Sequence, residues 1–107
     1  MADITLEVCV DDIAGVRTAV AGGADRIELC QNLGAGGLTA SLGLMKAARG
    51  CGVPVHALIR PRAGGFVYTD FELDVMLNDI AAARDLGLHG VVFGALTASG
   101  KDRKSVV

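Results

Sequence analysis

The sequence predicts an α/β fold, because short apolar stretches rich in Val, Ile and Leu alternate with amphipathic stretches at helical spacing. This alternation is typical of a parallel sheet covered by helices. No Gly-x-Gly-x-x-Gly follows the first stretch, so an open dinucleotide-binding sheet is not indicated. Glu7, Glu28 and His56 lie inside strands, where burial on both sides would be costly. At a barrel mouth, water or neighbouring groups would satisfy them. We therefore predict a TIM-type (β/α)8 barrel, of which this chain supplies about the first four βα units.

Four strands are expected, each short and rich in β-branched residues. They are residues 4–10 (ITLEVCV), 26–30 (RIELC), 53–60 (VPVHALIR) and 90–96 (GVVFGAL). Pro54 falls at the start of the third strand, where a missing N–H is tolerated. Right-handed crossovers place the carboxyl ends of all four strands at one edge. Ligands gather at that edge in such sheets.

Three helices are expected between the strands, within residues 12–23, 41–50 and 71–87. Asp11 or Asp12, Ser41 and Asp70 stand where an N-cap is needed. Glycines follow the apolar stripe of each helix and are expected to end it. Each strand is thus followed by a turn signal and, for the first three, by a helix.

The composition is that of a globular domain, with 51% hydrophobic and 21% charged residues. A net charge of −2 without a basic run argues against a nucleic-acid or anionic-membrane partner. No apolar stretch reaches the roughly 18 residues that span a bilayer, and no signal-peptide pattern is evident. The three cysteines form no Cys-x-x-Cys pair, so reduced thiols are expected. We expect a cytoplasmic protein.

The chain is short for a barrel, since (β/α)8 barrels run to about 250 residues. Residues 1–101 read as the N-terminal half of such a barrel. Alone, that half would leave sheet edges exposed, so the chain either dimerises into a full barrel or is truncated. Residues 102–107 (DRKSVV) continue none of the preceding pattern. We expect them to be a non-native, artefactual tail.

Two successive strands end in the same Glu-x-Cys pattern, Glu7 to Cys9 and Glu28 to Cys30. Side chains two residues apart share one face of a strand. Neighbouring parallel strands lie about 4.8 Å apart. The two thiols are therefore expected to approach each other at the mouth, with both carboxylates beside them.

The third strand adds His56 and Arg60 on a shared face, four residues apart. We expect Arg60 to pair with Glu28, and Arg62 with its glycine-rich loop to cover the mouth. Two guanidinium groups in this segment (RPRAGG) also suit a phosphate or a carboxylate. The loop at residues 34–37 (GAGG) either presents N–H groups to an anion or only turns the chain.

Three interpretations of the thiols stay open. Two neighbouring thiols suit a soft ion such as Cu(I), and an adjacent guanidinium would lower their pKa. Free cysteines are also often small buried hydrophobes, and a redox or catalytic thiol is the third possibility. Cys51 and His89 precede strands at the opposite end of the sheet, so we exclude Cys51 from the site.

Four segments together resemble the CutC family, described as copper-homeostasis proteins. They are LEVCVDDIAG, GGADRIELCQNLGAGGLTAS, VPVHALIRPRAGGFVYTD and GVVFGALTASG, which cover residues 4–101 in order. The resemblance implies a (β/α)8 barrel of more than twice this length and a homo-oligomer.

The same resemblance implies Cu(I) handling in the cytoplasm, with Cys9 and Cys30 as the thiol ligands. Glu7 and Glu28 would then stand behind the ligands, and Arg60 would orient them. No established reaction comes with the resemblance. The alternative is therefore an uncharacterised barrel enzyme that acts on a small anionic substrate through Arg60, Arg62 and a mouth carboxylate.

Overall fold

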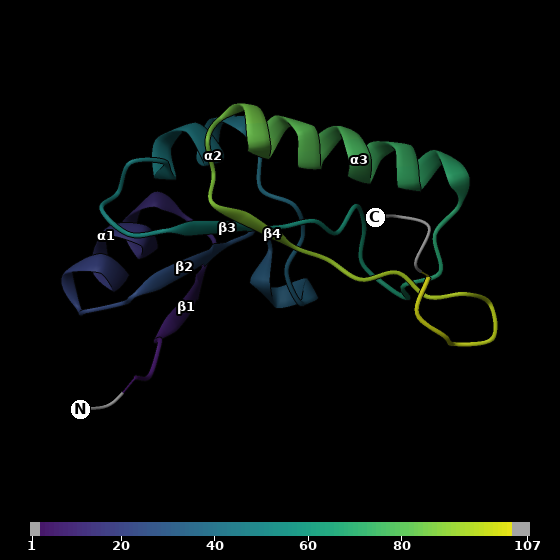
Figure 1. Ribbon diagram of the computed structural model, residues 1–107, viewed down its shortest axis with the longest axis horizontal. Helices are drawn as coiled ribbons and strands as arrows, with labels where there is room; N and C mark the ends of the chain where they lie inside the picture. Colours follow the sequence, from purple (N-terminus) through teal and green to yellow (C-terminus); the bar gives the residue numbers. More distant parts are fainter. Residues whose placement is uncertain (1–2, 104–107) are drawn as a thin grey trace.

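The computed structural model describes residues 3–103 and contains one sheet of four parallel strands in the order β1-β2-β3-β4. The strands are β1 (Glu7–Val10), β2 (Arg26–Leu29), β3 (Val55–Leu58) and β4 (Gly90–Val92). The connections contain α1 (Ile13–Ala21), the 3-10 turn η1 (Leu33–Ala35), α2 (Leu42–Ala48) and α3 (Asp70–Asp85). The three α-helices cover one face of the sheet (Figure 1). The predicted α/β fold is confirmed, with the four strands and three helices in the predicted order.

The strands are shorter than the sequence suggests: β3 and β4 each lack four of the expected residues, and β1 lacks three at its start. Ile4 and Leu6 were expected within the strand, yet Ile4 is 80% and Leu6 52% exposed. The Leu6 carbonyl accepts hydrogen bonds from the N–H groups of Asp25 and Arg26, and the Leu6 N–H donates to the Asp25 side chain at 2.8 Å, so Leu6 is held at the start of β2 without continuing the strand ladder. The content of β-branched residues alone therefore overestimates the length of a strand that has a neighbouring strand on one side only.

The first two predicted helix caps are confirmed. Asp12 accepts a hydrogen bond from the N–H of Gly15 through Oδ1 at 2.6 Å. Ser41 accepts one from Leu44 through Oγ at 3.1 Å. Each side chain satisfies an N–H group that has no partner within its helix.

The predicted cap of α3, Asp70, is wrong by one residue. Thr69 is the N-cap, and it forms a capping box with Glu72: the Thr69 Oγ accepts from the Glu72 N–H at 3.1 Å, and the Glu72 carboxylate accepts from the Thr69 N–H at 2.9 Å. Thr-x-x-Glu satisfies two N–H groups at once, whereas Asp70 would satisfy one. Asp70 is instead the first helical residue.

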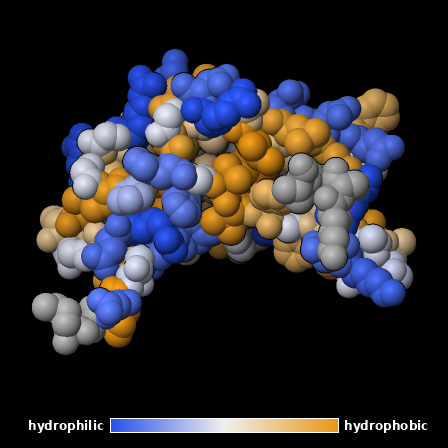
Figure 2. Space-filling view, in the orientation of Figure 1, coloured by the Kyte–Doolittle hydropathy of each residue, from blue (hydrophilic) through white to orange (hydrophobic). Residues whose placement is uncertain are grey.

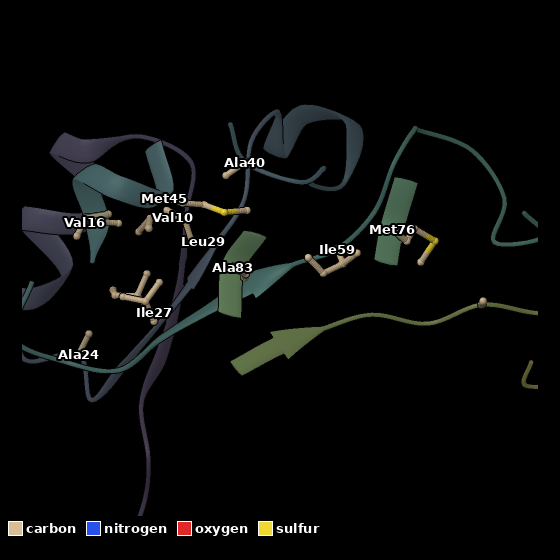
Figure 3. Close-up of a cluster of buried hydrophobic side chains, with 14 of the residues drawn as sticks. Val10, Val16, Ala24, Ile27, Leu29, Ala40, Met45, Ile59, Met76 and Ala83 are labelled. Atoms are coloured by element: carbon tan, nitrogen blue, oxygen red, sulfur yellow. The ribbon is translucent and has the colours of Figure 1, made fainter. Parts of the chain in front are cut away.

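The core lies between the sheet and its helices. Ile27, Leu29, Val55 and Ala57 alternate along β2 and β3 and are completely buried. The helices bring side chains such as Met45 against this layer, and Figure 3 labels Met45 together with Ile27 and Leu29. Because strand side chains alternate, the residues between these four point to the opposite, helix-free face. That face carries the polar residues singled out in the sequence.

Candidate functional site

One row of residues crosses the helix-free face from strand to strand. The register pairs Cys9 with Glu28, Glu28 with His56, and His56 with Gly90. Cys9 is exposed, and Glu28 and His56 are half-buried. Gly90 makes space for the histidine ring, since a Cβ there would lie 3.1 Å from two of the ring atoms. We call these four residues the inner row.

Cys9 and Glu28 are directly joined, because the Cys9 Sγ donates a hydrogen bond to Glu28 Oε2 at 2.7 Å. This hydrogen bond is the largest cause that raises the pKa of Cys9 from 9.0 to about 12, followed by desolvation and by the charge of Glu28. The expectation that a guanidinium lowers the pKa of this thiol is therefore wrong. A carboxylate is the neighbour, and it keeps the thiol protonated at neutral pH.

Cys30 lies on the same face but not opposite Cys9. Equivalent positions of the two Glu-x-Cys patterns are offset by two residues, because β1 and β2 pair Cys9 with Glu28. The predicted side-by-side placement of the thiols is wrong for this reason. The charge of a Cys30 thiolate is nevertheless among the smaller causes that raise the pKa of Cys9.

Cys30 is enclosed by the loop that follows its own strand. It is 2% exposed, and its Sγ lies 3.5 Å from the Val10 carbonyl oxygen. Gly37, at φ +92°, passes directly over it: a Cβ there would lie 3.5 Å from the sulfur and 2.9 Å from Leu58 Cδ2. Burial raises the pKa of Cys30, as do the charges of Asp11 and Glu28.

Glu7 makes an ion pair that the sequence did not predict. Its carboxylate lies 2.5 Å from the Nε of Arg26, the residue opposite it in β2. The signal was available in the sequence, since Arg26 begins the second strand, but only the register shows that the two residues face each other. Glu7 therefore lies opposite Arg26, two residues before Cys9 on β1, and is not one of the inner-row residues.

Arg60 does not pair with Glu28, contrary to the prediction. Its Nη1 donates to the carbonyl oxygens of Ala35 and Gly37 at 2.8 and 3.1 Å, and its Nη2 donates to that of Gly64 at 3.0 Å. The guanidinium also lies 5.2 Å from the centre of the Phe66 ring. It joins the loops after β2 and β3, and the loop at 34–37 offers it carbonyl oxygens where an anion would need N–H groups.

Arg62 is also held by its own surroundings. It forms an ion pair with Glu72 at 2.6 Å, donates to the carbonyl of Val67 at 2.9 Å, and stacks 4.9 Å from the centre of the Tyr68 ring. It therefore ties the loop after β3 to the start of α3. Neither arginine offers an unoccupied fork to a substrate phosphate or carboxylate.

Metal ligands are sparse on this surface. Between residues 3 and 103, no group of three or more His, Cys, Asp or Glu side chains is close enough to hold a metal ion. No helix between residues 3 and 103 is long and apolar enough to cross a membrane.

The predicted tail, residues 102–107, is only partly described. Asp102 forms an isolated antiparallel β-bridge with Leu96, and residues 104–107 lie outside the described part.

Comparisons with known sequences all point to the same family. The chain matches the CutC family over residues 4–106. A protein of Rhizobium meliloti (strain 1021), named as a CutC family protein, is 62% identical over 101 residues, which is 94% of this chain and 41% of that protein. A CutC family protein of Aliivibrio fischeri (strain MJ11) is 52% identical over 98 residues, 91% of this chain and 40% of that protein. The chain spans about two fifths of the length of these relatives.

Solved structures agree with the predicted fold. A crystal structure titled as the putative copper homeostasis protein CutC from Streptococcus agalactiae superposes with a TM-score of 0.83 at 38% identity, over 89% of this chain and 47% of that one. The N-acetylmannosamine-6-phosphate 2-epimerase from Clostridium perfringens superposes with a TM-score of 0.52 at 19% identity, over 91% of this chain and 39% of that one. The second likeness shows the fold alone, which is part of a TIM barrel.

Proposed function

Because the chain belongs to the CutC family of copper-homeostasis proteins, we propose that it binds Cu(I) as cargo in the reducing cytoplasm, through the thiols of Cys9 and Cys30. The supporting observation is that Cys9 in β1 and Cys30 directly after β2 lie on the helix-free face, at the carboxyl ends of neighbouring strands. Soft thiolates select Cu(I) over harder divalent ions. The donor set is therefore chemically suited to this ion.

The two thiols differ in access, and this difference gives each a part in binding. Cys9 is exposed and meets an incoming ion first, whereas Cys30 is buried beneath Gly37. Both must lose a proton before they bind a metal. Glu28 accepts the hydrogen bond of the Cys9 thiol at 2.7 Å, so its carboxylate is placed to receive that proton.

The alternative function, an enzyme that binds an anionic substrate through Arg60 and Arg62, has less support. The hydrogen bonds of Arg60 go to three loop carbonyls. Those of Arg62 go to Glu72 and to loop carbonyls. An anion would have to displace several of these bonds at once, and some of them fix the loops themselves.

A competition titration against a chromophoric Cu(I) chelator under reducing conditions tests the proposal. We expect binding by the natural sequence, and loss of that binding in Cys9→Ser and in Cys30→Ser. Cys51→Ser is the matched control, because Cys51 lies in the turn before β3 and donates to the Val53 carbonyl, away from the inner row. Equal binding by Cys9→Ser and by the natural sequence would overturn the proposal.

A further inference from the structure

Cys30 lies beneath its own loop, away from two grooves of the described structure. Its side chain is 2% exposed. One groove, of about 310 Å³, lies beside α3 and β4 and is lined in part by Leu88 and Val91; Figure 2 shows its apolar surface in the middle of the molecule. The other, of about 400 Å³, lies between α1 and the end of α2. Among the described residues, neither groove is lined by Cys30. An ion or a reagent therefore reaches this sulfur only after part of the chain moves.

The base of the loop that covers Cys30 is fixed by hydrogen bonds of the backbone. Gln31 and Leu38 exchange two of them, at 2.8 and 2.7 Å, and thereby close the loop between them. Directly after the loop, the Thr39 N–H donates to the Arg60 carbonyl at 3.0 Å, and the Thr39 Oγ1 accepts from the Arg60 N–H at 2.8 Å. These contacts use only the backbone of Arg60, so they do not depend on its side chain.

The 34–37 part of this loop is held by the guanidinium of Arg60. Nη1 donates to the carbonyl oxygens of Ala35 and Gly37 at 2.8 and 3.1 Å. Nη2 donates to the carbonyl oxygen of Gly64, in the loop after β3, at 3.0 Å. Gly37 is the residue whose backbone passes over the Cys30 sulfur. One side chain therefore joins the cover of Cys30 to a second loop.

Arg60 acts on Cys30 through these hydrogen bonds and not through its charge at the sulfur. Burial, followed by the charges of Asp11 and Glu28, raises the pKa of the Cys30 thiol, and Arg60 is not among the causes that the described residues supply. Hydrogen bonds from a guanidinium are stronger than those between neutral groups. The contact on the other side of the loop is longer, since the Leu33 N–H donates to Asp11 Oδ2 at 3.4 Å. The Arg60 contact is therefore the stronger of the two.

We propose that Arg60 is a latch whose guanidinium holds the 34–37 loop closed over Cys30, so that the thiol becomes accessible when these hydrogen bonds open. Arg60 is then a positioning residue, which sets the rate of access to Cys30 and neither binds the ion nor holds an anion. The inference rests on the proposed function for the identity of the ion, Cu(I). The closure of the loop over the thiol does not depend on copper.

Alkylation of the folded chain, with each cysteine resolved by peptide mass spectrometry, tests the latch without copper. In Arg60→Gln we expect Cys30 to react roughly ten to a hundred times faster than in the natural sequence, because hydrogen bonds from a charged donor are lost. Cys51 should keep its rate, since it lies in the turn before β3. Arg62→Gln is the matched control: the bonds of Arg62 go to Glu72 and to carbonyls of its own loop, so the rate of Cys30 should not change.

Two further variants separate the latch from other effects of the substitution. Arg60→Lys keeps the charge but loses the fork, and one ammonium group cannot replace the bonds to both loops, so Cys30 should still react faster than in the natural sequence. Gly36→Ala acts from the loop side, because its Cβ would lie 3.0 Å from Arg60 Nη1, and it should also accelerate Cys30. An unchanged rate of Cys30 in these variants, or an equal acceleration of Cys30 and Cys51, would overturn the proposal.

Release of Cu(I) from the loaded chain to an excess of chelator tests the consequence for the ion. We expect faster release from Arg60→Gln than from the natural sequence, with a smaller change in equilibrium affinity, because the latch alters access to the sulfur and leaves both thiols in place. Faster alkylation of Cys30 without any Cu(I) binding by the natural sequence would overturn the proposed function and retain the latch. Cu(I) binding with equal rates of release and of alkylation in Arg60→Gln would overturn the latch and retain the proposed function.

Discussion

At the residue scale, the central feature is the hydrogen bond that the Cys9 thiol donates to the Glu28 carboxylate. The sequence pattern correctly marks Glu7, Cys9, Glu28 and Cys30 as residues of one face, because alternation along a strand is fixed by the backbone. Which residues are opposite each other depends on the register, and sheared sheets offset neighbouring strands. The two-residue offset replaces a thiol–thiol contact by the contact of Cys9 with Glu28.

The chemical reactivity of Cys9 should reflect this neighbour. Its pKa is raised to about 12, with the hydrogen bond to Glu28 as the largest cause. We therefore expect alkylation of Cys9 to be slow near pH 8 and to accelerate up to about pH 12. Glu28→Gln removes the charge and should move the profile back toward pH 9. Iodoacetamide labelling with mass spectrometry at each pH measures this.

Glu7→Gln is the matched control for that profile, because Glu7 has the smallest of the effects that raise the pKa of Cys9 and is paired with Arg26. Its alkylation profile should stay close to that of the natural sequence. If Glu28→Gln and Glu7→Gln shift the profile equally, the hydrogen bond is not the cause.

Gly37 is a second residue with a specific requirement. Its φ is +92°, and a Cβ added at this position would lie only 2.9 Å from Leu58 Cδ2, so both the backbone and the space exclude a side chain. Gly37→Ala should therefore lower the free energy of unfolding by about 1–3 kcal/mol, as measured by urea denaturation. Gly34→Ala in the same loop is the control, since the nearest atom to its added Cβ would be 3.8 Å away. Equal losses in both variants would contradict this account of the loop.

At the scale of the elements, the loops show what the sequence does not determine. The caps Asp12 and Ser41 were predictable because a cap acts on its own helix, within three residues. The partners of Arg60 were not, because the carbonyl oxygens of Ala35 and Gly37 lie 25 and 23 residues away and are exposed only by the loop conformation. An arginine is usually expected to pair with a carboxylate. Backbone carbonyl oxygens are present at every residue, so the sequence does not indicate which of them an arginine will contact.

The start of α3 allows a direct comparison between the predicted and the observed cap. Thr69→Ala removes the capping box and should cost about 1 kcal/mol in the free energy of unfolding. Asp70→Ala removes only an exposed ion pair with Arg103 at 3.3 Å and should cost less than about 0.5 kcal/mol. Urea denaturation compares the two. A larger loss of unfolding free energy for Asp70→Ala than for Thr69→Ala would contradict Thr69 as the N-cap and support Asp70, the residue predicted from the sequence.

Acid should weaken the same helix end. The hydrogen bond from the Thr69 N–H, followed by the Arg62 side chain, lowers the pKa of Glu72 below 4.5. Because this pKa is lowered in the folded state, the stabilisation is complete above pH 4.5 and is lost as the pH falls through the folded value. Glu72→Gln should therefore lose less stability than the natural sequence between pH 7 and pH 3, measured by urea midpoints.

Asp79, on the same helix, provides a control because its pKa is shifted in the opposite direction to that of Glu72. Burial raises its pKa above 3.8, so its ionisation disfavours folding as the pH rises. Asp79→Asn should consequently gain stability relative to the natural sequence at pH 7, and this gain should shrink toward pH 3. The same pH trend in Glu72→Gln and Asp79→Asn would contradict the two assignments.

At the scale of the whole molecule, hydrophobic periodicity was enough to predict the fold. Val, Ile and Leu in β2 and β3, glycines after the helices and the alternation of elements all agree with one parallel sheet. Strand ends were less predictable, because pairing at an edge depends on whether a neighbour is present. This chain covers less than half of the streptococcal CutC structure, so the sequence in hand determines only part of that fold.

The most direct test of the central claim is X-ray absorption spectroscopy of the chain after loading with one equivalent of Cu(I) under reducing conditions. If Cys9 and Cys30 hold the ion together, the copper edge should be that of Cu(I) and the nearest shell should fit two sulfur atoms. Cys9→Ser should lose that two-sulfur shell. A nearest shell of nitrogen or oxygen atoms, or a two-sulfur shell that persists in Cys9→Ser, would contradict the account.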